Sequence, residues 1–254
     1  MNIVTRLTGL CLLLSCWACQ PTPATEPPPA VPDTLTLPVP VPPPAPKTPP
    51  AAPAALESRL QAQGLVNIKS VDPEIQVQMM YSTTDNFLHA DVYEDFDACY
   101  LLKGSAEMLA QAQALLRARH PDLRLITFDC VRPRSVQYKM WDIVKNTPQQ
   151  EYVAPPGGRG SMHNYGAAVD LGLVHVDTGL VDMGTPFDFF GELAHPQLET
   201  KFLASGELKP WHVANRQILR TCMRGAGFAG IPHEWWHFVA YDPEYVRVTF
   251  KIVD

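Results

Sequence analysis

The chain has 254 residues, of which 46% are hydrophobic, and a formal net charge of −6. This composition allows one or two globular domains with a sizeable core. The negative charge argues against a nucleic-acid-binding protein, which would normally present a basic face. Of the 26 prolines, 15 lie between Pro21 and Pro53. The chain therefore divides into a proline-rich N-terminal part and a globular domain of roughly 200 residues.

Residues 1–19 have the features of a bacterial lipoprotein signal. Arg6 is their only charged residue, and the apolar run from Leu7 to Cys19 is too short for a membrane-spanning helix, which needs about 20 residues. Leu13-Leu14-Ser15-Cys16 resembles the lipobox, in which the signal is cut before a cysteine that then receives a lipid. We expect lipidation at Cys16, with Cys19 as the alternative. An ordinary cleaved signal peptide is the other interpretation.

Residues 20–55 are predicted to form a disordered tether, because they contain almost no large apolar or aromatic side chains. Their proline runs favour polyproline II at ~3.1 Å per residue, so the tether would reach on the order of 100 Å. It would hold the domain, residues 56–254, away from a membrane. A ligand for proline-binding modules is the alternative. The expected location is outside the cytoplasm, lipid-anchored in the bacterial cell envelope, in the periplasm or at the outer membrane.

Within the domain, hydrophobic periodicity predicts a mixture of helices and strands. In chain order we expect strands at 66–68 and 75–77, a helix at 105–119, a strand at 123–129, a helix at 135–144, a strand at 167–174, a helix at 214–225, and closing strands at 235–241 and 245–253. The order is not a regular alternation of strand and helix. We therefore predict an α+β fold, in which helices cover an antiparallel sheet.

Two segments concentrate the side chains that bind metals. One runs from Ser161 to Asp170 and contains His163, and the other is His233-Glu234-Trp235-Trp236-His237. Imidazole and carboxylate groups suit zinc, and a catalytic zinc takes three protein ligands and keeps one position open. The sequence therefore predicts a zinc site in a cleft on the sheet.

The second segment alone has the His-Glu-x-x-His spacing of a zincin helix. Its surroundings oppose a helix, since Gly230 and Pro232 precede it and the aromatic residues within and after it favour a strand. A site assembled from both segments is the better interpretation.

Together the two segments resemble a known family. Ser161-x-His163-x-x-Gly166-x-Ala168-x-Asp170, followed by Glu234-x-Trp236-His237, matches the signature of the VanX-type D-alanyl-D-alanine dipeptidases. These are zinc D,D-peptidases related to the hedgehog signalling domain. Segments at 81–87, 129–133 and 181–188 resemble further family segments in the same order, although Val131 replaces a family tyrosine. The resemblance covers about residues 65–245.

The resemblance implies a metal site and a catalytic pair. One zinc ion per chain would be bound by His163, Asp170 and His237, with His233 as a neighbour that is not a ligand. Glu234 would be the general base, and Arg132 would stabilise the charge of the tetrahedral intermediate.

The resemblance also implies a substrate site for a small zwitterionic dipeptide. Ser161, Tyr81 and Asp188 would hold the two ends of that dipeptide. A carboxylate partner for the substrate ammonium group, the role expected of Asp188, is a natural way to require a free N-terminus.

The domain contains three cysteines, Cys99, Cys130 and Cys222. In an exported protein one pair can form a disulfide, and the sequence leaves the choice of pair open.

The leading hypothesis is an exported zinc dipeptidase that hydrolyses D-alanyl-D-alanine or a similar small dipeptide derived from peptidoglycan. One alternative is a D,D-carboxypeptidase or related peptidoglycan peptidase that acts on wall stem peptides. Another is a non-catalytic, metal-retaining module that binds the cell wall. Glu234 and Arg132 argue against the binding module, because binding alone needs neither.

Overall fold

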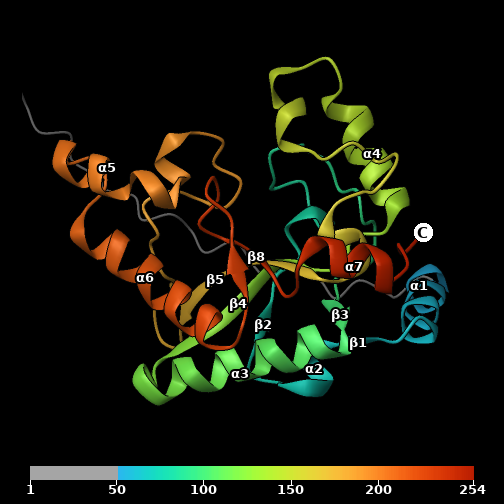
Figure 1. Cartoon of the computed structure of the whole chain (residues 1–254), viewed down its shortest axis with the longest axis horizontal. Coiled ribbons are helices and arrows are strands. Elements are labelled where there is room, and N and C mark those ends of the chain that lie inside the picture. The colour runs from blue at the N-terminus through green and yellow to red at the C-terminus, as the bar shows by residue number, and fades with distance from the viewer. Residues whose placement is uncertain (1–50) are drawn as a thin grey trace, which may run out of the picture. The chain divides into compact units, whose positions relative to one another are not determined.

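The computed structural model describes residues 51–254 (Figure 1). The expected lipoprotein signal and most of the expected tether lie outside the described residues. Helix α1 (Ala51–Ala62) begins within the stretch that the sequence analysis assigns to the tether. Among the helices of the described part, none is long and apolar enough to cross a membrane.

The main sheet has six strands, which are mostly antiparallel. Five follow the order β2 (Gln76–Val77), β4 (Leu123–Asp129), β5 (Ala168–His175), β8 (His237–Val239) and β7 (Ala229–Gly230), and β6 (Gly179–Leu180) also pairs with β5. Only β2 and β4 run parallel. A smaller sheet pairs β1 (Leu65–Asn67) with β3 (Tyr100–Leu102). The predicted α+β class is confirmed.

Helices pack around this sheet (Figure 1). They are α2 (Ile68–Val71), α3 (Lys103–Arg119), α4 (Arg134–Val144), α5 (Glu199–Ser205), α6 (Pro210–Gly225) and α7 (Pro243–Thr249). The long helices α3 and α6 contact each other, and they lie against β4 and β5 respectively. Short 3₁₀ helices complete the chain: η1 (Met80–Ser82), η2 (Pro148–Tyr152), η3 (Met162–Tyr165), η4 (Glu192–Ala194) and η5 (Pro196–Leu198).

Strand β5 lies in the middle of the sheet, and all of its residues except His175 are buried. Because side chains alternate along a strand, Asp170 and Gly172 lie on one face of β5, and Val169 and Leu171 lie on the other face. A Cβ at Gly172 would lie 3.0 Å from the Phe128 ring, so glycine lets that ring pack directly on the backbone. The face of β5 that carries Asp170 is therefore closely covered.

The predicted closing strand at 245–253 is wrong, because this stretch contains helix α7. Asp242 caps the helix by accepting hydrogen bonds from the backbone N–H groups of Glu244 (2.9 Å) and Tyr245 (3.1 Å), and Pro243 occupies the first turn. The β-branched residues that favoured a strand are outweighed by this cap and by the full burial of Val246. The region 176–213, where no element was expected, contains α5.

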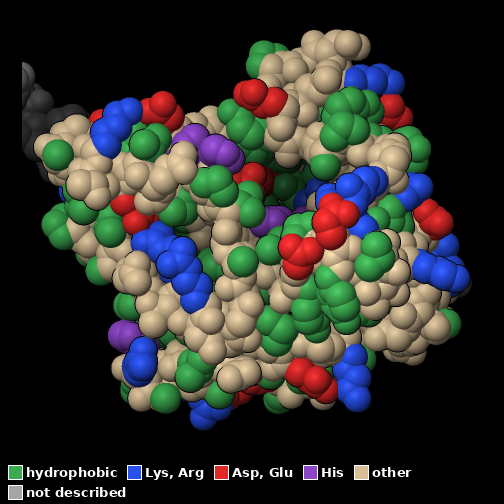
Figure 2. Space-filling view, viewed as in Figure 1, with side chains coloured by type: hydrophobic (Ala, Val, Ile, Leu, Met, Phe, Trp, Pro, Cys, Tyr) green, Lys and Arg blue, Asp and Glu red, His purple; other side chains and the backbone are tan. Residues whose placement is uncertain are grey.

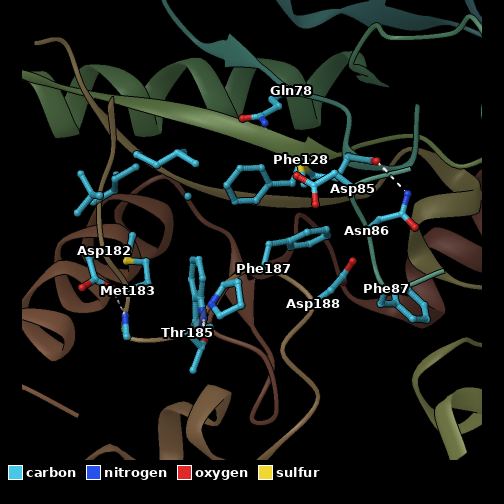
Figure 3. A pocket seen from close by; sticks show the side chains of 18 of the residues that line it. Gln78, Asp85, Asn86, Phe87, Phe128, Asp182, Met183, Thr185, Phe187 and Asp188 are labelled. Atoms are coloured by element: carbon cyan, nitrogen blue, oxygen red, sulfur yellow. Dashed lines mark hydrogen bonds between the residues drawn. The ribbon is translucent and has the colours of Figure 1, made fainter. Parts of the chain in front are cut away.

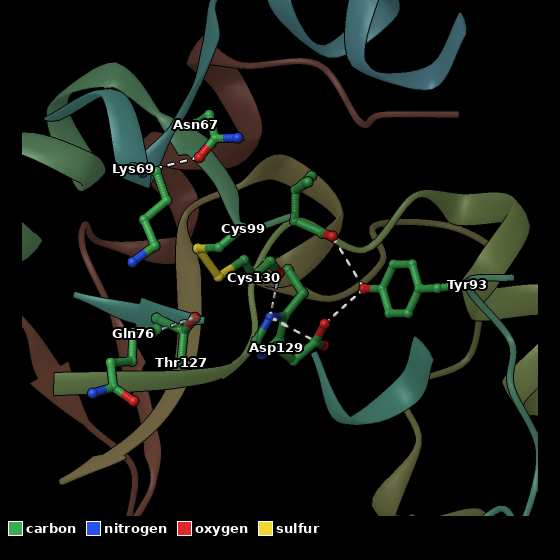
Figure 4. Close-up of a disulfide and its surroundings, with 10 residues drawn as sticks. Asn67, Lys69, Gln76, Tyr93, Cys99, Thr127, Asp129 and Cys130 are labelled. Carbon is green, nitrogen blue, oxygen red and sulfur yellow. Dashed lines mark hydrogen bonds and ion pairs between the residues drawn. A yellow bond between two sulfur atoms is a disulfide. The ribbon is translucent and has the colours of Figure 1, made fainter. Parts of the chain in front are cut away.

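A disulfide joins Cys99, just before β3, to Cys130, just after β4 (Figure 4). It therefore links the small sheet to the large one. Cys222 is a buried free thiol.

Candidate metal centre and its cleft

Three separate elements bring the expected metal ligands together. His163 lies in η3, Asp170 lies on β5, and His237 lies on β8. The antiparallel register of β5 and β8 places His237 directly opposite Asp170. Directly opposed residues point to the same face of a sheet, so this pairing makes neighbours of two residues that are distant in sequence.

The motif around His163 builds the turn that presents it. The Ser161 hydroxyl accepts the His163 N–H at 3.3 Å, and the Asn164 side chain accepts the Ser161 N–H at 2.7 Å, which together form a capping box. Gly166 ends the turn with φ 70°, and a Cβ there would lie 2.8 Å from the Leu65 side chain. Ser161 therefore shapes the turn as well as lining the cleft.

The three donor atoms converge at a spacing that suits a metal ion. His237 Nδ1 lies 2.9 Å from Asp170 Oδ1 and 3.2 Å from His163 Nε2, and His163 Nε2 lies 3.4 Å from Asp170 Oδ2. Bonds of 2.0–2.1 Å at tetrahedral angles keep zinc ligand atoms about 3.3–3.4 Å apart. The donor set is therefore compatible with a tetrahedral metal.

The surroundings of these ligands favour their metal-binding forms. His163 Nδ1 lies 2.8 Å from the Cys130 carbonyl, which orients the ring and leaves Nε2 to face the other donors. Burial opposes ionisation of Asp170, but His163 and His237 lower the pKa of its carboxyl. A buried carboxylate beside two imidazoles is the chemistry expected of a ligand set.

The zincin alternative is not supported. Residues 233–236 form no helix, and the His233 ring packs edge-on against His195, with the ring centroids 5.1 Å apart. His233 is thus outside the converging group, which contains His163, Asp170 and His237.

Glu234 lies beside the three donors. Its Oε2 atom is 3.9 Å from His237 Nδ1, and its side chain is 23% exposed. Burial raises the pKa of Glu234, although His237 opposes this effect. The carboxyl is thus close enough to exchange protons with a group bound at the centre.

Arg132 is held rigidly next to the site. Its Nε and Nη2 atoms donate to Asp129 Oδ2 at 2.9 and 2.5 Å, and its Nη1 donates to Gln137 Oε1 at 3.1 Å. Tyr93 donates a hydrogen bond of 2.6 Å to the other oxygen of Asp129. Burial opposes the charge of Arg132, but Asp129 raises its pKa, so the guanidinium stays cationic. Tyr93 and Gln137 belong to no motif, and neither was predicted from the sequence.

Asp188 lies beside Tyr81 in the wall of the cleft. The Tyr81 hydroxyl donates to Asp188 Oδ1 at 2.9 Å, whereas Asp188 Oδ2 is buried and has no hydrogen-bond partner among the described residues. Burial and the nearby Asp170 raise the pKa of Asp188. A buried polar atom without a partner is costly and marks a place where a ligand group can bind.

These groups line a cavity of about 140 Å³. Its walls include all eight residues that the sequence analysis assigns to the site within the domain: Tyr81, Arg132, Ser161, His163, Asp170, Asp188, Glu234 and His237. Figure 2 shows a hollow near the middle of one face, where acidic, basic and histidine side chains gather.

Three aromatic residues from distant segments narrow this cavity. The Phe190 ring stacks on Tyr152, with centroids 4.0 Å apart, and meets Phe87 edge-on at 4.6 Å. All three line the cavity. Phe87 ends the segment 81–87, which resembles a family segment, whereas Tyr152 and Phe190 belong to no motif and were not predicted.

A larger cavity of about 690 Å³ lies next to the first (Figure 3). Phe87 and Asp188 line both cavities, but none of the three converging residues His163, Asp170 and His237 lines the larger one. The smaller cavity, where the donor atoms converge, is therefore the candidate site.

Comparison with known proteins shows the family of this chain. Residues 61–253 match the family model described as Peptidase_M15, D-ala-D-ala dipeptidase. The D-alanyl-D-alanine dipeptidase of Escherichia coli (strain K12) is 30% identical over 174 residues, which cover 68% of this chain and 83% of that relative. That of Enterococcus faecalis (strain ATCC 700802 / V583) is 31% identical over 190 residues, covering 67% and 88%. The chain belongs to the D-Ala-D-Ala dipeptidase family of metallopeptidases.

Proposed function

We propose that this protein is a zinc dipeptidase that hydrolyses D-alanyl-D-alanine, or a dipeptide of similar size, outside the cytoplasm. The main observation is the combination of converging metal donors with a narrow cavity of about 140 Å³. Pockets for drug-sized ligands usually measure about 300–1,000 Å³, so this one suits a much smaller substrate.

The residues of the site supply the steps of peptide hydrolysis. A zinc ion held by His163, Asp170 and His237 would lower the pKa of a bound water molecule and polarise the scissile carbonyl. Glu234 accepts a proton from the attacking water and passes it to the leaving amine. Arg132, fixed in place by its buried partners, places its positive charge where the carbonyl oxygen becomes negative.

The same cavity explains why the substrate should have a free N-terminus. Asp188 Oδ2, which has no protein partner in the described structure, is available to a substrate ammonium group, while Tyr81 holds the other carboxyl oxygen. Binding of the ammonium group would supply the missing partner of a buried carboxylate. Ser161 lies in the same wall and is assigned to the substrate as well.

These features argue against the two alternatives. A carboxypeptidase that trims stem peptides needs room beyond the scissile residues, which the stack of Tyr152 and Phe190 restricts. A binding module has no use for a carboxyl like that of Glu234 beside the metal ligands or for a buried cation like Arg132.

We also propose that the protein is exported and lipid-anchored in the cell envelope, through Cys16 or Cys19. The lipobox-like sequence supports this location. The Cys99–Cys130 disulfide supports it too, because disulfides persist mainly in oxidising compartments.

A direct assay tests the proposed function. Purified protein is given free D-alanyl-D-alanine or a muramyl pentapeptide, with and without a chelator, and its zinc content is measured. We expect about one zinc ion per chain, chelator-sensitive cleavage of the dipeptide, and little cleavage of the pentapeptide. His237→Ala should lose zinc, whereas the control His233→Ala should keep it. Preferential cleavage of the pentapeptide would support the carboxypeptidase instead.

A further inference from the structure

Asp188 lies in a wall segment, residues 183–193, that has almost no regular secondary structure of its own. Figure 3 shows Met183, Thr185, Phe187 and Asp188 along this segment, with their side chains around the larger cavity. Asp188 itself has φ 59°, in the left-handed region. An irregular segment with an unfavourable backbone conformation needs contacts from outside to keep its shape.

Arg216 of helix α6 supplies such contacts at both ends of the wall segment. Its Nε atom donates to the Met183 carbonyl at 2.7 Å, and its Nη1 atom donates to the Leu193 carbonyl at 3.0 Å. The side chain is fully buried. One planar guanidinium thus fixes the separation of two carbonyls that lie on either side of Asp188 in the chain.

The same guanidinium contacts the strand side of the site. Its central carbon lies 5.9 Å from the centre of the Trp235 ring, and Trp235 Nε1 donates to the Thr185 hydroxyl at 2.8 Å. Trp235 follows Glu234 directly in sequence. Arg216 therefore lies where the wall segment meets the segment of the expected base.

The buried guanidinium of Arg216 shares the carboxylate of Glu199 with Arg220. Glu199 Oε1 lies 3.5 Å from Arg216 Nη1, and the two oxygens of Glu199 accept hydrogen bonds from Arg220 at 2.8 and 2.7 Å. Burying a cation is costly unless it is paired. The two carbonyl groups of the wall segment supply the shorter hydrogen bonds of this guanidinium, at 2.7 and 3.0 Å.

We propose that Arg216 is a positioning residue that sets the place of Asp188 and thereby the preference of the enzyme for substrates with a free amino group. The inference rests on the proposed function, in which Asp188 binds the substrate ammonium group. Arg216 touches neither the substrate nor the metal donors. It acts through the wall segment.

Arg220 provides a matched control. It lies one turn further along α6 and pairs with the same Glu199, but among the described residues its hydrogen bonds reach Glu199 and Gln217 and not the wall segment. Replacing Arg220 disturbs the same buried ion pair without releasing the carbonyls of Met183 and Leu193.

The experiment compares two substrates in the full-length zinc protein. One is D-alanyl-D-alanine, and the other is propionyl-D-alanine, in which hydrogen replaces the amino group. The kcat/KM for D-alanyl-D-alanine divided by that for propionyl-D-alanine measures recognition of the ammonium group. Arg216→Met should lower this ratio by about 10–100-fold, since a misplacement of about 1 Å can cost 10²-fold. Arg220→Met should leave the ratio near that of the wild type, and Arg216→Lys, which keeps a donor, should fall between the two.

Amide hydrogen exchange over residues 183–193 gives a second, independent measurement. We expect faster exchange in Arg216→Met or Arg216→Lys, with zinc content unchanged, and no such change in Arg220→Met. An unchanged ratio or unchanged exchange in both Arg216 variants would overturn the inference, as would an equal effect in Arg220→Met.

Asp188→Asn separates this inference from the proposed function. If Asp188→Asn lowers the substrate ratio and the Arg216 variants do not, the positioning role of Arg216 is wrong. If Asp188→Asn leaves the ratio unchanged, the proposed role of Asp188 fails, and with it the link from Arg216 to substrate preference.

Discussion

Asp188 combines two unfavourable features in one residue. Its backbone is in the left-handed region at φ 59°, and one of its carboxyl oxygens is buried and unpaired among the described residues. Sparsely populated backbone conformations cost of order 1–3 kcal/mol and persist where function uses them. In the proposed function, the substrate ammonium group would supply the missing partner of this carboxyl oxygen.

Asp188→Asn should stabilise the substrate-free protein at neutral pH while weakening substrate binding. Burial raises the pKa of Asp188 above 3.8, its ordinary value. The folded protein therefore binds this proton more tightly than the unfolded chain, so stability falls as the pH rises from about 4 toward the folded pKa. The amide can still accept the Tyr81 hydrogen bond, and asparagine tolerates the left-handed region.

Thermal unfolding of the two proteins at pH 4 and pH 7 measures this effect. We expect a higher Tm for Asp188→Asn at pH 7, by about 2–4 °C for each kcal/mol gained, and a smaller difference at pH 4. A lower Tm at pH 7 would show that the ionised carboxylate stabilises the fold.

Glu234→Gln should separate proton transfer from metal binding. The side chain lies beside the metal donors but outside the converging group, so the variant should retain zinc. Loss of a general base typically lowers kcat by about 10²–10⁴. Zinc content and kcat are measured in the same preparations. A metal-free Glu234→Gln protein would make Glu234 a ligand, and a fully active one would assign the base to another residue.

At the scale of elements, a disulfide and a backbone hydrogen bond hold the chain at the end of β4. Cys130 is joined to Cys99, the Val131 N–H donates to the Tyr100 carbonyl at 3.0 Å, and Arg132 follows directly. Strand β3 of the small sheet and strand β4 of the main sheet therefore position Arg132 together.

Replacing both Cys99 and Cys130 with alanine should destabilise the domain. The cysteines are 31 residues apart, and a crosslink over that separation contributes about 3–4 kcal/mol in the chain-entropy model. Urea unfolding gives the free energy of unfolding of the variant and the parent. Cys222→Ala, which removes a buried thiol but no crosslink, should cost less. Equal losses in the two variants would mean that the crosslink adds little.

The sequence predicted helices and strands well where the hydrophobic pattern is regular, and less well where a helix cap decides between helix and strand. The strand at 123–129 was predicted with its observed bounds, whereas α7 was mistaken for a strand because its cap at Asp242 carries little weight in a periodicity argument. Motif spacing located the residues of the cavity. Tyr152, Phe190 and Arg216 could not be found in this way, because their roles depend on which loops the fold brings together.

For the whole molecule, the match to the family spans residues 61–253, so the expected chemistry belongs to the described domain. The N-terminal residues carry the separate expectation of export and anchoring. A protein that begins at Ala51 should therefore cleave the free dipeptide with a kcat/KM close to that of the full chain, because a soluble dipeptide reaches either form equally.

The full-length protein should carry a lipid on Cys16 or Cys19. Membrane association should then survive high salt, since insertion of hydrocarbon is not screened as charge contacts are. Mass spectrometry of the mature N-terminus and fractionation in about 1 M salt provide the test. An unmodified N-terminus after Cys19 on a protein in the soluble fraction would exclude the lipid anchor.

The contact between the Cys130 carbonyl and His163 Nδ1 links the disulfide to one of the expected metal ligands. A newly made chain with reduced cysteines would hold this carbonyl less firmly, and the His163 ring would be less well oriented. Metal capture should therefore follow oxidation in the order of maturation. The protein would then become fully active only after it reaches an oxidising compartment. It would not hydrolyse dipeptide efficiently in a reducing compartment.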